Sequence, residues 1–448
     1  MNTPMERTEV NVVAHINPTI AHEVDSLRLV DTHEHLMPEA ERQAQPLDFF
    51  YLFPHYASSD LISAGMPYAT LERIRDPKRP LEERWAEFAP YWPNVRTTGY
   101  GKSLLRACQG LFGVDDINEN TYLEVSERLA ASNRPGWYHY VLKDKARIDV
   151  SIIDSLSLDG RPITEVDRDV FAPVVRFDKY VTPTTRSELR LLEDWSGLSI
   201  HSLDDLLGAL DSSFEKAVKG GAVGVKSGLA YLRILSYDKV SRHEAEACFN
   251  RIFSHLDPLR ESSRPSPSYG LGWAEAKPLQ DYMMHQVIRR AIDYGLPLQI
   301  HTGLQEGNSN VITNSNPTHL VNLLIEYPEA RFDLFHAGYP YTSEMATIGK
   351  NFANAYVDLC WVHIISPFVA RRVLHEWLET VPANKIFAFG GDYIVVEGAY
   401  GHAEMARDNV ARVLSEKVEE GYFTEDEAIR VARQILRDNP ASLFRLPL

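Results

Sequence analysis

The stretch LRLVDTHEH, residues 27–35, places two histidines one residue apart at the end of an apolar run. In a strand the side chains alternate between the two faces, so His33 and His35 point to the same side. On a helix the same spacing would put them on nearly opposite sides. The apolar residues Leu27, Leu29 and Val30 favour the strand, and the pair is therefore a candidate metal chelate at a strand end.

Seven further apolar segments follow, each ending at polar or glycine residues. Together with residues 27–33, the expected strands are 147–154, 171–177, 221–227, 296–302, 330–336, 354–360 and 385–392. Helical patterns separate most of them, at 203–219, 279–295, 317–329 and 366–381, although the connection between the second and third strands is short for a helix. Eight alternating units predict an α/β fold, a closed (β/α)₈ TIM barrel. An open doubly wound sheet is the alternative, but no glycine-rich phosphate motif follows the first strand.

A barrel of this kind needs about 250 residues, so insertions must account for much of the rest of a 448-residue chain. The sequence predicts one elaborated domain, 1–448, with a helical insertion over 37–145 after the first strand and a smaller one over 236–277 after the fourth. The first is rich in aromatic residues, and we expect it to cover the mouth of the barrel.

The composition narrows the choice of partner. The formal charge is −16, from 62 acidic and 46 basic residues, which argues against nucleic acid or an anionic membrane and favours a small-molecule substrate. Three widely spaced cysteines, Cys108, Cys248 and Cys360, predict neither disulfides nor a thiolate zinc site. Without a signal peptide or a segment of membrane-spanning length, we expect a cytoplasmic protein, and a homo-oligomer is compatible with the sequence.

Other predicted strands also end in residues with metal or acid–base chemistry: Lys226, His301, His336 and Asp392 end the fourth, fifth, sixth and eighth strands. Each has an ordinary structural explanation, such as a core histidine or a helix-capping aspartate. Active sites of such barrels lie at the carboxyl ends of the strands, so these residues should meet His33 and His35 at one mouth. That convergence predicts a functional site.

The motifs DTHEHL, VGVKSG, IHTG, FHAGYPY and FGGDY resemble the amidohydrolase superfamily over nearly the whole chain. The later motifs look most like nodulin-type amidohydrolase domains, and the long first insertion is similar to that of uronate isomerases. The resemblance implies a metal-dependent-hydrolase barrel with the ligands His33, His35, His301, His336 and Asp392, and one or two divalent ions per chain, zinc or manganese. Lys226 matches the position of a carboxylated lysine bridge. It is either such a carbamate ligand or an ammonium that anchors the substrate.

The resemblance also implies a reaction. A metal would acidify a water and polarise a carbonyl, while Asp392 would orient the water, take its proton and return it to the leaving group. Lys226 would be required for turnover in either role. The candidates for substrate binding are Arg233, Tyr231, Arg96, Tyr100, Glu306, Tyr339, Trp361 and His363.

The predicted function is hydrolysis of a C–N or C–O bond, in an amide, lactone or ester, of a small carboxylate-bearing molecule. The alternative is a metal-dependent decarboxylase or a uronate-isomerase-like enzyme on the same site. A third hypothesis is a barrel that binds a metabolite without turnover. The complete set of candidate metal ligands argues against it.

Overall fold

The computed structural model describes residues 16–157, 160–254 and 270–448. Eight parallel strands follow one another around a single sheet in chain order. They are β1 (Leu29–Glu34), β2 (Ile148–Ile153), β3 (Phe171–Arg176), β4 (Gly224–Ser227), β5 (Leu298–Ile300), β6 (Phe332–Leu334), β7 (Ala355–Asp358) and β8 (Ile386–Phe387). All eight predicted strands are present, and the predicted (β/α)₈ barrel is confirmed.

The sheet closes where the chain after β8 runs beside β1. The amide of Thr32 donates to the Phe389 carbonyl at 3.2 Å, and the Asp392 amide donates to the His33 carbonyl at 2.7 Å. The strands are buried along almost their whole length, as parallel strands covered on both faces must be.

Helices surround the barrel wherever the connection is long enough. They are α10 (Asp178–Val181), α11 (Arg186–Ser196), α12 (Leu203–Lys219), α13 (Arg242–Ser254), α14 (Trp273–Asp293), α15 (Val321–Glu326), α16 (Thr342–Asn351), α17 (Val362–Ile365), α18 (Pro367–Thr380), α19 (Val396–Glu419), α20 (Glu425–Arg433) and α21 (Asn439–Leu443), with α1 (Pro18–Ser26) before the first strand. In the described residues they are joined by the 3₁₀ turns η3 (Leu229–Tyr231), η4 (Ile312–Ser315), η5 (Pro317–Leu320), η6 (His336–Gly338) and η7 (Ala383–Lys385), and by the π-helical turn η8 (Gln434–Asp438). Among the described residues between β2 and β3 there is no helix, as the short connection predicted.

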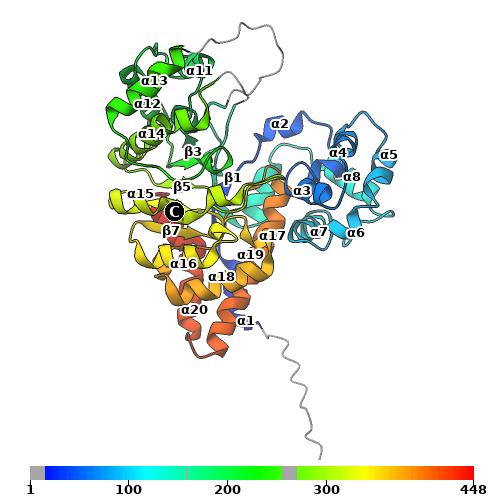
Figure 1. Ribbon diagram of the computed structural model, residues 1–448. Coiled ribbons are helices and arrows are strands. Elements are labelled where there is room, and N and C mark those ends of the chain that lie inside the picture. The colour runs from blue at the N-terminus through cyan, green and yellow to red at the C-terminus, as the bar shows by residue number, and fades with distance from the viewer. Residues whose placement is uncertain (1–15, 158–159, 255–269) are drawn as a thin grey trace, which may run out of the picture.

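The segment 37–145 after β1 is helical. It contains α2 (Glu39–Gln43), η1 (Phe49–Leu52), α3 (Tyr56–Ser63), α4 (Tyr68–Arg75), α5 (Leu81–Phe88), α6 (Trp92–Val95), α7 (Gly99–Phe112), α8 (Tyr122–Ala131), α9 (Trp137–His139) and η2 (Tyr140–Lys145). Figure 1 shows α3 to α8 grouped beside α17 and α19. Glycines permit this close packing, because a Cβ on Gly99 would lie 2.0 Å from the Ile364 carbonyl oxygen, and one on Gly401 would lie 2.2 Å from that of Ser103.

The segment 236–277 contains α13 and the start of α14. Most of its proline- and serine-rich part lies outside the described residues. At the opposite end of the barrel from the strand ends, Leu443 and Phe444 pack on Ile152, Val174 and Phe387, so the C-terminal residues cover the strand beginnings. No helix in the described parts of the chain is long and apolar enough to cross a membrane.

Candidate metal centre at the mouth of the barrel

The six strand-end residues predicted from the sequence lie at the carboxyl ends of their strands. His33 and Lys226 lie in β1 and β4. His35 and His301 directly follow β1 and β5, and the loops after β6 and β8 carry His336 and Asp392. All are buried except His35, whose side chain keeps 26% of its exposure. The structure therefore brings this set to one mouth, as the topology predicted.

The four histidines form two pairs. The Nε2 atoms of His33 and His35 lie 3.2 Å apart, and His336 Nε2 lies 3.0 Å from His301 Nδ1. Asp392 faces both pairs, because its Oδ1 lies 3.3 Å from His35 Nε2 and its Oδ2 lies 3.8 Å from His336 Nε2. Such separations suit side chains that share one ion.

Hydrogen bonds fix which ring nitrogen of each histidine is free. In each ring, the nitrogen that points away from the other histidines faces an oxygen that can only accept a hydrogen bond. His33 Nδ1 faces Gln299 Oε1 at 3.2 Å, and His35 Nδ1 faces the Asp154 carbonyl at 3.2 Å. His336 Nδ1 faces the Cys360 carbonyl at 2.9 Å, and His301 Nε2 faces the Leu304 carbonyl at 2.9 Å. These nitrogens must carry the hydrogen, so the lone pairs of the other four point into the cluster. This is the usual arrangement of metal-binding histidines.

The protonation states also suit a metal. Burial lowers the pKa of all four imidazoles, and that of His336 falls to about 4, so they are neutral at physiological pH. Burial opposes ionisation of Asp392, but His336, His35 and Lys226 outweigh it and hold the pKa of its carboxyl below the usual value. Neutral imidazoles and a carboxylate are a donor set for zinc or manganese.

Cys360 also lies close to this set. Its Sγ and ligand atoms of His336 and Asp392 are all within 4.8 Å of one another. Burial raises the pKa of the thiol well above its usual range, so Cys360 is protonated here and is no ready ligand.

The backbone is strained where it presents these groups. His336, Trp361 and Asp392, which follow β6, β7 and β8, have φ of +63°, +68° and +57°. Non-glycine residues rarely adopt this region, and such strain clusters at functional sites. The two glycines before Asp392 are required sterically, because a Cβ on Gly391 would lie 1.8 Å from Glu34 Oε1 and one on Gly390 2.4 Å from Thr32 Oγ1.

Lys226 is a buried residue of β4. Its Nζ is 3.6 Å from the centroid of the Phe335 ring. Burial lowers the pKa of the amine to about 8, with the charge of Arg176 acting in the same direction and Asp392 opposing it. A substantial fraction of this amine is therefore neutral near physiological pH.

Two strand-end residues at the mouth were not singled out in the sequence. Asp154 and Arg176 follow the same rule, because the first comes directly after β2 and the second ends β3. Arg176 Nε donates to Asp154 Oδ2 at 2.5 Å, and Arg176 Nη2 lies 2.5 Å from the same oxygen in an ion pair. That oxygen lies 3.8 Å from His35 Nδ1. Their position at strand ends was the signal that could have found them.

The first insertion contacts the cluster through Tyr56, which was also not singled out in the sequence. The Tyr56 hydroxyl donates to the Asp392 carbonyl at 2.5 Å, and its ring stacks on Trp361 at 4.7 Å and on Tyr100 at 5.1 Å. Next to it, His55 interacts electrostatically with Asp392. The predicted contacts Trp361 and Tyr100 therefore lie at the mouth.

On the other side of the mouth lie two more predicted contacts. The Tyr231 ring is 4.6 Å from the His301 ring, and its hydroxyl accepts a hydrogen bond from the Glu306 amide at 3.0 Å. The structure brings these two residues to the cluster as well.

Three predicted substrate contacts are not brought to the cluster. Arg233 is buried and its guanidinium is engaged by Asp281 at 2.5 Å and by Gln280 at 3.1 Å, so it stabilises the packing of α14 and is corrected to a structural residue. His363 is also corrected, because the Ala388 carbonyl and Asn409 engage its two ring nitrogens.

The third is Arg96, which forms an ion pair with Asp116 inside the insertion. Tyr339 lies next to the cluster through its backbone, since its amide donates to the His336 carbonyl at 2.8 Å. The positions of Arg233 and Arg96 differ from the prediction because a residue pattern does not identify ion-pair partners that lie far apart in the sequence.

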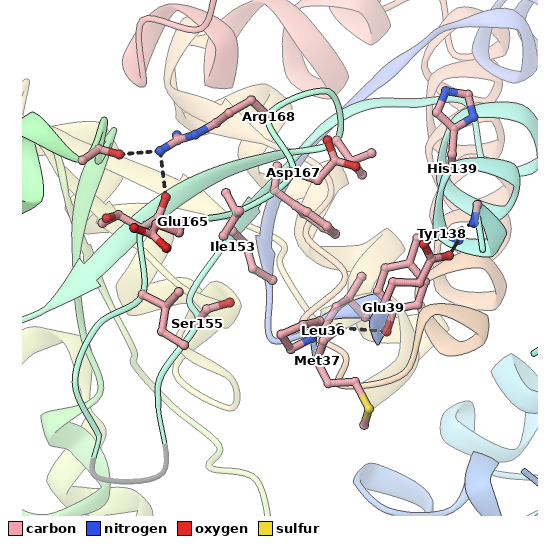
Figure 2. Close-up of a pocket in the computed structure, with 18 of the residues that line it drawn as sticks. Leu36, Met37, Glu39, Tyr138, His139, Ile153, Ser155, Glu165, Asp167 and Arg168 are labelled. Atoms are coloured by element: carbon pink, nitrogen blue, oxygen red, sulfur yellow. Dashed lines mark hydrogen bonds between the residues drawn. The ribbon is translucent and has the colours of Figure 1, made fainter. Parts of the chain in front are cut away.

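A separate pocket of about 900 Å³ lies beside the mouth (Figure 2). Leu36, Met37 and Glu39 line it on one side, and Ile153 and Ser155 on another, next to the connection that has no helix. None of the four histidines lines it. Its charged groups are largely engaged locally; Arg168, for example, donates to the Thr164 carbonyl at 2.8 Å. We therefore place the chemistry in the histidine cluster and not in this pocket.

Comparison with known proteins gives one match to a family model: residues 258–446 match the amidohydrolase model. The protein fluG of Emericella nidulans is 32% identical over 230 residues, which are 50% of this chain and 26% of fluG. The chain thus matches only about a quarter of the length of this curated relative.

Solved structures share the fold over nearly the whole chain. A uronate isomerase from Thermotoga maritima is 20% identical with a TM-score of 0.76, covering 95% of this chain and 96% of its own. Glucuronate isomerase from Caulobacter crescentus is 19% identical with a TM-score of 0.76, over 96% and 94%. A candidate metal-dependent hydrolase from Lactobacillus casei is 19% identical with a TM-score of 0.65, over 95% and 97%. The predicted resemblance is confirmed, to amidohydrolases in sequence and to uronate isomerases in fold.

Proposed function

We propose that the protein is a metal-dependent hydrolase that cleaves a C–N or C–O bond in a small carboxylate-bearing molecule. One observation supports this above all. The two histidine pairs turn the free ring nitrogens of all four imidazoles toward one another, and the carboxylate of Asp392 lies between the pairs. A divalent ion held there would supply Lewis-acid polarisation of a substrate carbonyl and would acidify a water.

In this proposal Asp392 is the general base. Its lowered pKa keeps it ionised at neutral pH, and it lies over the cluster with Oδ1 and Oδ2 facing different histidine pairs. It orients the attacking water, accepts the proton and returns it to the leaving group. The hydrogen bond from Tyr56 to its backbone carbonyl holds this residue in its strained conformation.

Arg176 is the proposed anchor for the substrate carboxylate. Asp154 engages Nε and Nη2 on one edge of the guanidinium, and no hydrogen bond from Nη1 occurs among the described residues. The side chain keeps 24% of its exposure. Guanidinium groups bind carboxylates through such paired donors. The rings of Tyr56, Tyr100, Trp361 and Tyr231 would form the walls around the substrate.

Lys226 determines how many ions the site holds. As a carbamate it would add two oxygens and a negative charge between the pairs, and two ions would fit. The lowered pKa of its amine supports this reading, because only a neutral amine reacts with carbon dioxide.

A second candidate is a one-metal decarboxylase or a uronate-isomerase-like enzyme. The observation in its favour is the contact of Lys226 Nζ with the face of the Phe335 ring, which suits an ammonium and not a carbamate. The fold shared with two uronate isomerases agrees with this candidate.

Product analysis in ¹⁸O-labelled water tests the proposal. Purified metal-loaded protein is screened against amides, lactones, uronates and aromatic acids. We expect turnover of an amide, ester or lactone with one ¹⁸O atom in the product acid. Turnover limited to uronates, or carbon dioxide released from an aromatic acid, would contradict hydrolysis and favour the second candidate.

A further inference from the structure

Gln299 occupies an unusual place beneath the histidine cluster. It lies in β5 two residues before His301, so both side chains point to the same face of the strand, toward the interior of the barrel. Its side chain is fully buried. A buried amide must find partners for both of its polar atoms, and here the partners determine how it is oriented.

Two acceptors fix the amide. Gln299 Nε2 donates to the Thr32 carbonyl at 2.8 Å and to Asp333 Oδ2 at 3.2 Å. Rotating the amide by 180° would place its oxygen against the carbonyl of Thr32, where no hydrogen is available. The amide oxygen must therefore face His33.

The orientation of the amide determines the tautomer of His33. Gln299 Oε1 lies 3.2 Å from His33 Nδ1 and can only accept, so Nδ1 carries the hydrogen and Nε2 keeps its lone pair toward His35. The other three histidines of the cluster are held in their tautomers by backbone carbonyls. His33 alone depends on a side chain, which can be changed by mutation.

We propose that Gln299 is a positioning residue that locks His33 in the tautomer required for metal binding. The inference rests on the proposed metal site, since it assigns to a residue outside the ligand set the task of preparing one ligand. Partners that orient metal-binding histidines typically contribute about 10- to 100-fold in metal affinity.

The test compares Gln299→Met with Gln305→Met. Methionine resembles glutamine in length but removes the acceptor. Gln305 is a matched control because it is also buried, donates to the Ala230 carbonyl and makes no hydrogen bond to a histidine among the described residues. Two quantities are measured: the dissociation constant for Zn²⁺ by chelator competition, and the ¹⁵N chemical shifts of the His33 ring in metal-free protein, assigned by their loss in His33→Ala.

We expect Gln299→Met to weaken Zn²⁺ binding about 10- to 100-fold and to convert His33 from the Nδ1–H form to a mixture of tautomers. Gln305→Met should change neither. Unchanged Zn²⁺ affinity in Gln299→Met, or equal losses in both variants, would overturn the inference.

If Gln299→Met does not fold, the ¹⁵N spectrum of metal-free wild type still tests the inference. An Nε2–H tautomer of His33 in that spectrum would overturn it. If wild type binds no Zn²⁺ at all, the proposed function fails, and the tautomer of His33 still decides the role of Gln299.

Discussion

Carboxylation of Lys226 can be tested by its dependence on pH. With a pKa of about 8, the amine is about 9% neutral at pH 7, whereas an ordinary lysine with a pKa of 10.5 is about 0.03% neutral. The structure thus supplies about 300-fold more reactive amine than an exposed lysine would. Between pH 6 and pH 7 the neutral fraction rises about ninefold, between pH 8 and pH 9 less than about twofold.

The assay reconstitutes metal-free protein with Zn²⁺ or Mn²⁺ at several pH values, with dissolved ¹³CO₂ held constant. We expect about two metals per chain, a ¹³C carbamate resonance, and a reconstitution rate that rises steeply to about pH 8 and then levels, because the neutral amine is the nucleophile. In Lys226→Ala the metal content should fall, and short carboxylic acids should partly restore it by filling the vacated bridge.

Two results would refute this reasoning. The first is one metal per chain in both wild type and Lys226→Ala, without a carbamate resonance. The second is reconstitution at the same rate with and without carbon dioxide. Either would favour an ammonium at Lys226 and the second candidate function.

Three other substitutions separate catalytic from structural roles. Asp392→Asn should lower kcat by about 10²- to 10⁴-fold, because the base is lost, with circular dichroism unchanged; a kcat near that of wild type would exclude Asp392 as the base. Arg233→Ala should lower the free energy of unfolding by about 1.5–3 kcal/mol, since the buried Asp281 loses its hydrogen bond from Arg233 and keeps its ion pair with Lys277. Denaturant titration should show this loss while KM stays unchanged; a raised KM with full stability would return Arg233 to the substrate site. Tyr56→Phe should cost only about 1 kcal/mol of stability through the lost hydrogen bond, yet lower kcat, and equal kcat in the two proteins would show that this contact does not support Asp392.

The barrel could be predicted because parallel strands are buried on both faces and therefore appear as short apolar runs. The positions of His301, His336 and Asp392 followed from the same runs, since each comes at the end of one. Asp154 and Arg176 ended strands as well, but an aspartate or arginine at that position is common, and only their mutual ion pair beside His35 distinguishes them.

Other parts of the site depend on contacts between distant segments. Tyr56 reaches Asp392 from an insertion more than 300 positions earlier in the chain, and periodicity does not indicate where such an insertion folds back. Arg233 was misplaced for the same reason: the sequence places it just beyond a catalytic strand, whereas its partner Asp281 lies on α14. The tautomers of the histidines depend on backbone carbonyls and on Gln299, and no residue pattern indicates such partners.

The metal content of the purified protein tests the central claim most directly. Elemental analysis after gentle purification, and again after refilling with zinc, manganese or cobalt, is compared between wild type and the His33→Ala, His35→Ala double variant. We predict at least one divalent metal per chain in wild type and none in the double variant, whose circular dichroism should be unchanged because these ligands lie at the mouth and not in the packed interior of the barrel. A wild-type protein that holds no stoichiometric metal before or after refilling, or a double variant that holds as much as wild type, would contradict the assignment of the site.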